Sequence, residues 1–201
     1  MKNSLIIIVF FLLGVVTGKA GLLPDSLPLG TSLEWTLLLL MLFIGLSFGS
    51  DPKLRDIIRS VNPRLLIVPL TTIAGTFLGI AIYNLLFSQL QPRDAFAVGA
   101  GFGYYSLSGI LISEFSGEKM GIIALLANVT REIITLLFAP LIVRVFGKTA
   151  AVSSGGATSM DTTLPVILKS SGKDYLIISL FHGIVLTILV PFIITLLYRG
   201  F

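Results

Sequence analysis

Long, uninterrupted apolar stretches dominate this chain and most constrain what it can fold into. Charged residues make up 12% of its 201 residues, against about 25% in soluble domains, and several stretches reach the roughly 20 residues that a membrane-spanning helix needs. A transmembrane barrel would instead show alternating segments of about ten residues. We predict an all-α polytopic membrane protein that forms one transmembrane domain over residues 1–201. Its five full spans are expected at residues 4–17, 33–48, 65–87, 120–143 and 175–198.

Two further apolar stretches, residues 95–115 and 150–168, are too rich in Gly, Ser and Thr to form ordinary helices. Glycine costs about 1 kcal/mol per helix position relative to alanine. Irregular backbone persists at membrane depth only where protein surrounds it or where it lines a cavity. We therefore predict two discontinuous helical segments, broken or re-entrant, in addition to the five spans.

The two discontinuous segments resemble each other. An offset of 55 residues places Ser106 on Asp161 and Gly101 on Gly156. A chance match is an open alternative, because the whole region is rich in Gly and Ser. Paired interrupted segments mark the binding site in many secondary transporters.

The charges predict how the chain is oriented. Residues 51–64 carry Lys53, Arg55, Arg59 and Arg64, and short basic loops stay in the cytoplasm, so the N-terminus is expected there too. Lys2 imitates the start of a signal peptide, but Gly18-Lys19-Ala20 is a poor cleavage site, which favours an ordinary first helix. The net charge of +4 lacks the clustered basic face that nucleic-acid binding needs.

Asp161 is the most informative single residue, because it lies in a hydroxyl-rich run between two apolar stretches. A carboxylate at the centre of a membrane helix costs at least ~2.5–3.5 kcal/mol, so an intramembrane acid marks a candidate functional site. Freed carbonyls and the hydroxyls of Thr158 and Ser159 would surround it, which suits a cation. In the alternative interpretation, Asp161 lies in an aqueous loop and caps the helix that Pro165 helps to start.

A second polar group lies within an apolar span. Asn128, Arg131 and Glu132 are spaced so that they share one helix face, which must point into the bundle or at a cavity. Glu132 is then a second acid near Asp161, and Arg131 holds a carboxylate. The alternative is an Arg131–Glu132 pair that neutralises itself and locks helices together.

A third group follows the glycines of the first discontinuous segment. Tyr105, Ser106 and Ser108, with Tyr104 beside them, could line an amine-binding cavity, partly through cation–π contact. Glu114 belongs either to this cavity or to the headgroup region. His182 either relays protons or serves as a packed hydrogen-bond partner.

Enzyme, metal and cofactor signatures are weak. The chain has no cysteine and one histidine, which excludes disulfides and thiolate metal sites. It lacks HExxH and P-loop motifs, and its glycines 99, 101 and 103 lack the context of a dinucleotide fingerprint. No nucleophile-elbow motif supports a hydrolase built from Ser159, Asp161 and His182. We predict no enzyme activity, no cofactor and no metal.

At these motifs the chain resembles the LysO-type lysine exporter family of bacteria and archaea. The matching stretches are residues 101–111, the Arg131-Glu132 helix, and residues 156–165. The resemblance implies that acids at Glu132 and Asp161 take part in export, and that the fold contains crossing broken helices. Longer family members carry an additional N-terminal hydrophobic block. The present chain resembles the C-terminal portion of such members, which implies completion by a homodimer or by a small N-terminal-type partner subunit, or else a different substrate.

Together these observations predict a proton-coupled secondary exporter of L-lysine or related basic amino acids in the cytoplasmic (inner) membrane of a prokaryote. The alternatives are a transporter of another small solute and a non-transporting subunit completed by a partner chain. The expected partners are the cationic substrate, protons and the lipid bilayer, without nucleic acid. The predicted substrate- and ion-binding residues are Asp161, Glu132, Arg131, Asn128, Ser106, Ser108, Tyr105, Thr158, Ser159, Glu114 and His182.

Overall fold

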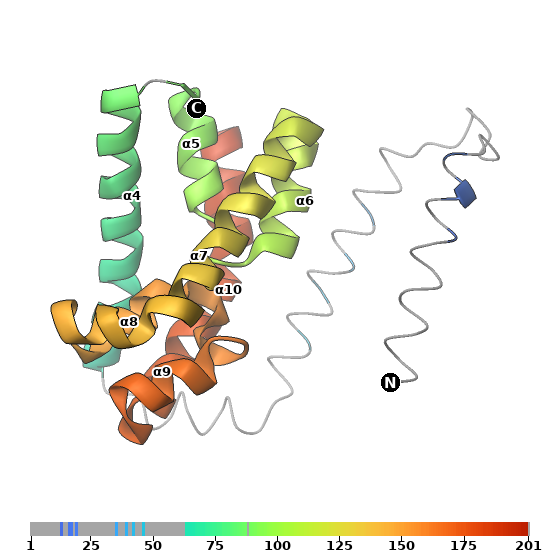
Figure 1. Cartoon of the computed structure of the whole chain (residues 1–201). Coiled ribbons are helices and arrows are strands. Elements are labelled where there is room, and N and C mark those ends of the chain that lie inside the picture. The colour runs from blue at the N-terminus through green and yellow to red at the C-terminus, as the bar shows by residue number, and fades with distance from the viewer. Residues whose placement is uncertain are drawn as a thin grey trace. The chain divides into compact units, whose positions relative to one another are not determined.

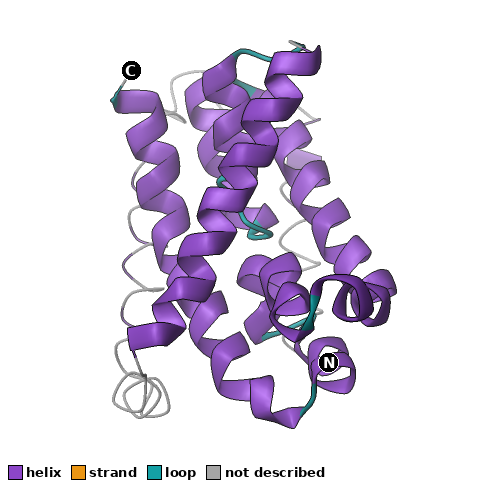
Figure 2. Ribbon diagram, turned by 90° about the vertical axis from the view of Figure 1, so that its left-hand side faces the viewer, coloured by secondary structure: helices purple, strands orange, loops and turns teal. Residues whose placement is uncertain are grey.

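The computed structural model describes residues 63–87 and 89–200, together with isolated positions nearer the N-terminus. The chain divides into two compact units, residues 1–50 and 51–201, and the description below concerns the second. The spans predicted at residues 4–17 and 33–48 and most of the basic loop lie outside the described residues. The described part is helical and contains no strand (Figures 1 and 2).

Three of the described helices are long and apolar enough to cross a membrane. They are Ile67–Phe87, Glu118–Phe146 and Lys173–Arg199, and they coincide within a few residues with three of the predicted spans. The elements in chain order are η1 (Pro63–Leu66), α4 (Ile67–Phe87), α5 (Pro92–Gly99), α6 (Tyr105–Ser116), α7 (Glu118–Phe146), α8 (Lys148–Gly155), η2 (Gly156–Met160), α9 (Leu164–Ser171), η3 (Lys173–Tyr175) and α10 (Leu176–Arg199).

The helices are separated by single glycines at three places. Gly117, Gly147 and Gly172 follow α6, α7 and α9, with φ of +87°, +91° and +106°. Such left-handed backbone is disfavoured for residues with a Cβ, and a glycine in this conformation commonly ends a helix. The chain can therefore turn sharply between consecutive helices without a long loop.

The two glycine-rich segments each form a pair of short helices. Residues 100–104 separate α5 from α6, and η2 with three further residues separates α8 from α9. These helices contain 8 and 12 residues in the first pair and 8 and 8 in the second. Each is shorter than the roughly 20 residues that cross a bilayer.

The long helices pack against these short ones (Figure 1). α7 packs along α6 and against α8, while α10 packs against η2 and also contacts α5, α6 and α8. α4 contacts α5, α8 and α10, but Pro69 and Thr72 are its buried residues. Most of the apolar surface of α4 is thus exposed in this unit.

The interruptions of the two pairs meet at one point, which we call the crossing. The backbone N–H of Ala157 donates to the carbonyl of Phe102 at 2.8 Å. Asn128 on α7 supports the same place, because its Oδ1 accepts from the N–H of Gly103 at 2.7 Å while its Nδ2 donates to the carbonyl of Val98 at 3.0 Å. Asn128 is 3% exposed. Its side chain thus links α7 to the end of α5 and to the turn that follows α5.

The close approach at the crossing requires a glycine at position 156. A Cβ on Gly156 would lie 2.0 Å from the carbonyl oxygen of Phe102, and its φ is +62°. The space and the backbone conformation therefore both exclude a side chain.

We expect Gly156→Ala to destabilise the protein more than Gly147→Ala does. Gly147 is the matched control, because its φ is also left-handed but a Cβ there meets nothing within 4 Å. Each variant loses about 1–2 kcal/mol from the backbone conformation, and Gly156→Ala loses about 1–3 kcal/mol more from overpacking. Thermal unfolding in detergent measures the difference. Equal unfolding temperatures for the two variants would contradict the tight crossing.

Candidate functional site

Asp161 lies in the turn that follows η2. Its Oδ1 accepts hydrogen bonds from the backbone N–H of Thr162 and from the Thr162 hydroxyl, the latter at 3.2 Å. Thr163, not Asp161, occupies the N-cap position of α9, so the interpretation of Asp161 as a helix cap is wrong. Asp161 is exposed, so its carboxylate can accept further hydrogen bonds in addition to those from Thr162.

Asp161 lines a small cavity of about 170 Å³, which we call the acidic cavity. This volume is below the ~300–1,000 Å³ of pockets for drug-sized ligands, so the cavity suits a small polar group. It receives residues from both interrupted segments and from α10. The residues lining it are Gly103, Tyr104, Tyr105, Ser106, Ala157, Thr158, Met160, Asp161, Thr162 and Thr187.

Two threonines of the acidic cavity differ in how their hydroxyls are used. The Thr158 hydroxyl donates to the carbonyl of Gly155 at 2.8 Å. Thr187 on α10 is 3% exposed, and its Oγ1 has no hydrogen-bond partner among the described residues. A buried hydroxyl without a partner costs about 1–3 kcal/mol, so this orphan group indicates a position for a ligand or a water molecule.

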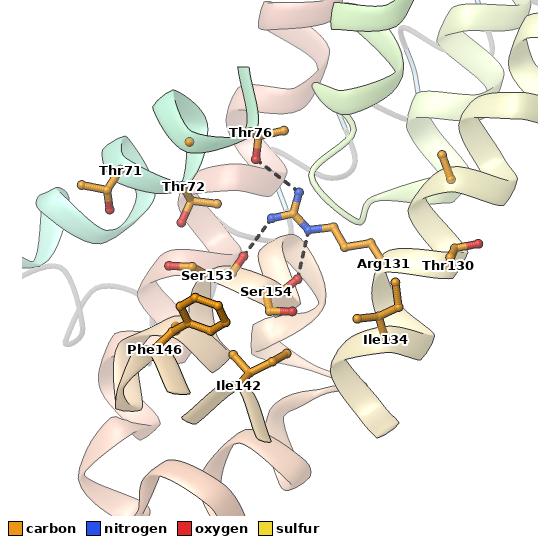
Figure 3. Close-up of a pocket in the computed structure, with 13 residues that line it drawn as sticks. Thr71, Thr72, Thr76, Thr130, Arg131, Ile134, Ile142, Phe146, Ser153 and Ser154 are labelled. Atoms are coloured by element: carbon orange, nitrogen blue, oxygen red, sulfur yellow. Dashed lines mark hydrogen bonds between the residues drawn. The ribbon is translucent and has the colours of Figure 1, made fainter. Parts of the chain in front are cut away.

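Arg131 lines a different cavity, of about 700 Å³, between α4, α7 and α8, which we call the arginine cavity (Figure 3). Its Nε donates to the carbonyl of Ser154 at 3.0 Å and its Nη2 to that of Ser153 at 2.8 Å. Its Nη1 reaches the Thr76 hydroxyl at 3.4 Å. The guanidinium thus lies at the C-terminal end of α8, where a cation interacts favourably with the helix dipole.

The three polar residues that were predicted to share one face of α7 have different surroundings in the structure. Asn128 supports the crossing and Arg131 binds the end of α8, whereas Glu132 is half-buried and lines neither cavity. Within the described part of the chain, Arg131 has no ion pair with Glu132, so the self-neutralising pair is wrong. Glu132 and Asp161 do not share a cavity either.

The remaining predicted residues divide between the acidic cavity and the interior. Tyr105 and Ser106 line the acidic cavity with Asp161. Ser108 is fully buried beside Gly101, outside both cavities. Ser159 and His182 are also fully buried and contact each other. Glu114 is exposed near the end of α6.

Sequence reasoning missed several hydroxyls that the fold places at the cavities. Thr72 and Thr76 line the arginine cavity together with Thr71, Ser153 and Ser154. Their spacing of four residues on an otherwise apolar helix was an available signal, since such residues share a face. Thr187 carried no comparable signal, because its importance depends on which groups surround it.

Comparisons with known proteins identify the family. The sequence profile described as Lysine exporter LysO matches residues 8–198. "Lysine exporter LysO" of Escherichia coli K12 is 35% identical over 162 residues, which cover 80% of this chain and 53% of that protein. A Haemophilus influenzae protein, provisionally named as a lysine exporter, is 29% identical over 186 residues, covering 91% of this chain and 92% of its own length. No solved structure matches. The chain spans about half the length of the Escherichia coli relative, and it is an integral membrane protein that belongs to the lysine exporter LysO family.

Proposed function

We propose that this protein exports L-lysine or a related basic amino acid across the cytoplasmic membrane by proton-coupled secondary transport. The names of its relatives support an amino-acid exporter. The observation that carries the proposal is the Asp161 carboxylate in a small cavity lined by hydroxyls. Such a set of oxygen atoms suits an ammonium group, because a carboxylate supplies the opposite charge and hydroxyls accept its N–H donors.

In this proposal the acidic cavity binds one ammonium group of the substrate. Asp161 neutralises its charge, and the orphan hydroxyl of Thr187 accepts one of its hydrogen bonds. Tyr104 and Tyr105 line the same cavity and can add cation–π attraction. An uncharged side chain of similar length gains neither the charge neutralisation nor the cation–π attraction, so the cavity favours basic amino acids whose side-chain cation enters it.

The substrate carboxylate meets Arg131 in the arginine cavity. Three contacts hold the guanidinium to α8 and α4, and a guanidinium has more N–H donors than these contacts use. The three contacts fix the orientation of the group, so its remaining donors are presented to the cavity without a large loss of side-chain entropy. The two cavities then bind the substrate at different stages of the transport cycle.

The two pairs of short helices are proposed to be the discontinuous membrane segments of the transporter, with the N-terminus in the cytoplasm. Rocking of the long helices against them would open the cavities alternately. Asp161 and Glu132 each exchange a cation for a proton during this cycle. We further propose an assembly, either a homodimer or a complex with a small partner subunit; the exposed apolar surface of α4 can be covered by lipid or by such a partner.

We expect Asp161→Asn to abolish lysine export while leaving the fold intact. The substitution removes the charge, but its amide oxygen can still accept from Thr162. Counterflow of radiolabelled lysine in proteoliposomes, with and without a pH gradient, should fall at least about tenfold, as expected when a charge-assisted contact of about 1.5–3 kcal/mol is lost. Asp174→Asn, at an exposed acid on η3, is the matched control and should transport normally. Wild-type counterflow by Asp161→Asn would exclude the proposed role.

Thr187→Val tests the orphan hydroxyl of the acidic cavity. The two side chains have nearly the same shape, and the hydroxyl has no protein partner in the described residues, so stability should be unchanged or slightly raised. The KM for lysine should rise about tenfold or more, because a hydrogen bond to a charged group is worth about 1.5–3 kcal/mol. Ser170→Ala is the control, since that hydroxyl bonds within its own helix. An unchanged KM would show that the substrate does not reach Thr187.

Glu132→Gln is expected to lower the transport rate and to change its pH dependence. The substitution keeps the size and most of the polarity of the half-buried side chain but removes its ability to bind a proton. Glu118→Gln on the same helix is the control, because Glu118 is exposed in the first turn of α7. Wild-type rates with an unchanged pH profile would mean that Glu132 has no part in proton exchange.

A further inference from the structure

The two carboxylate oxygens of Asp161 are engaged unequally. Oδ1 accepts hydrogen bonds from both the backbone N–H and the hydroxyl of Thr162, the latter at 3.2 Å. A carboxylate oxygen offers about two lone-pair sites, so these two donors use the acceptor capacity of Oδ1. Within the described residues no hydrogen bond reaches Oδ2. Oδ2 therefore keeps its full capacity for a ligand in the acidic cavity.

A second acceptor in the acidic cavity comes from a different element. Thr187 on α10 is 3% exposed, and its Oγ1 has no hydrogen-bond partner among the described residues. The Thr158 hydroxyl differs, because it donates to the carbonyl of Gly155 at 2.8 Å. The cavity thus offers a ligand single oxygen atoms from separate elements, and not the paired oxygens of a carboxylate that is free on both sides.

Basic amino acids carry their side-chain charge on two kinds of group. The ammonium of lysine is a compact point charge whose N–H donors rotate, whereas the guanidinium of arginine is a rigid planar fork. The fork binds a carboxylate best through a pair of parallel N–H···O bonds, one to each oxygen. Because Oδ1 is occupied, Asp161 can offer the fork only one oxygen. An ammonium loses nothing by this, since each of its donors needs a single acceptor. The cavity volume of about 170 Å³ also favours the smaller group.

We propose that Thr162 is a positioning residue that makes the acidic cavity selective for primary ammonium groups over guanidinium groups. By holding Oδ1, Thr162 removes the bidentate pairing that a guanidinium gains from a free carboxylate. The inference rests on the proposed function for the identity of the transported substrate. It narrows the substrate class from basic amino acids to those whose side chain ends in a primary amine, such as lysine and ornithine.

The competing explanation is that Thr162 only stabilises the turn between η2 and α9. Thr162 is exposed, and its backbone N–H supplies one of the two hydrogen bonds to Asp161 whatever its side chain is. A purely structural hydroxyl would affect the binding of every substrate by the same factor. The two explanations therefore differ in the ratio of two affinities measured on the same protein.

Lysine and L-homoarginine form a matched pair of ligands for this measurement. Their side chains have the same methylene chain and differ only in ending in an ammonium or a guanidinium. Each unlabelled amino acid is added as an inhibitor of radiolabelled lysine counterflow by the full chain in proteoliposomes. We expect homoarginine to inhibit at least about tenfold more weakly than lysine, the factor that corresponds to one hydrogen bond to a charged group. Equal inhibition by the two would overturn the proposal.

Two variants at position 162 test the positioning role. Thr162→Val removes the hydroxyl but keeps the backbone N–H, so it frees a lone-pair site on Oδ1, and the ratio of the two inhibition constants should fall about tenfold. Thr162→Ser keeps a hydroxyl and should keep the wild-type ratio. A partly inactive preparation does not change this ratio, because both ligands meet the same molecules. A wild-type ratio in Thr162→Val, or a lost preference in Thr162→Ser, would overturn the role of the hydroxyl.

Thermal unfolding in detergent separates this inference from the proposed function. The chloride salts of methylammonium and methylguanidinium carry the two cationic groups without an amino acid attached. Greater stabilisation by methylammonium, lost in Thr162→Val, in a protein without lysine flux contradicts the exporter but supports the selective cavity. Lysine flux that homoarginine inhibits as strongly as lysine does supports the exporter and overturns the selectivity.

Discussion

The hydrogen bond between the two chain interruptions, from Ala157 N–H to the Phe102 carbonyl, is the contact on which the rest of the site depends. An interrupted helix exposes backbone groups that cost several kcal/mol each if they remain unpaired in hydrocarbon. Here the interruptions pair with each other and with the Asn128 amide. Each interruption thus supplies a hydrogen-bond partner to the other. The two interruptions can approach this closely because Gly156 has no Cβ.

The crossing places the residues that line the two cavities close to each other along the chain. The acidic cavity takes residues from both interrupted segments, and the arginine cavity takes Ser153 and Ser154 from the helix that leads into the second interruption. Any motion of α8 that changes the contacts of Arg131 also acts on Gly156 and its contact with Phe102. Because α8 leads directly into η2 without a loop, we expect a change at one cavity to affect the other.

The sequence predicted the three long helices of the described part and the glycines between its helices, because apolar length and glycine content act locally. The role of Asp161 stays a prediction, but Ser106, which the 55-residue offset places on Asp161, lines the same cavity. The partners of Arg131 could not be predicted, since they are backbone carbonyls that exist only where the end of α8 meets α7. For the same reason the sequence could not distinguish Thr187, whose hydroxyl is an orphan, from threonines that bond to their own helices.

The separation of Arg131 from Asp161 suits the proposed transport of a zwitterion. Opposite charges at about 4 Å attract strongly in a protein interior, and a direct pair would leave neither group available to a substrate. Arg131 is instead held by neutral carbonyls, which orient the guanidinium without neutralising its charge, and Asp161 is held by Thr162 in the same way. Both charges therefore stay unneutralised by each other within the described fold. A substrate that carries both an ammonium and a carboxylate can then interact with each of them in turn.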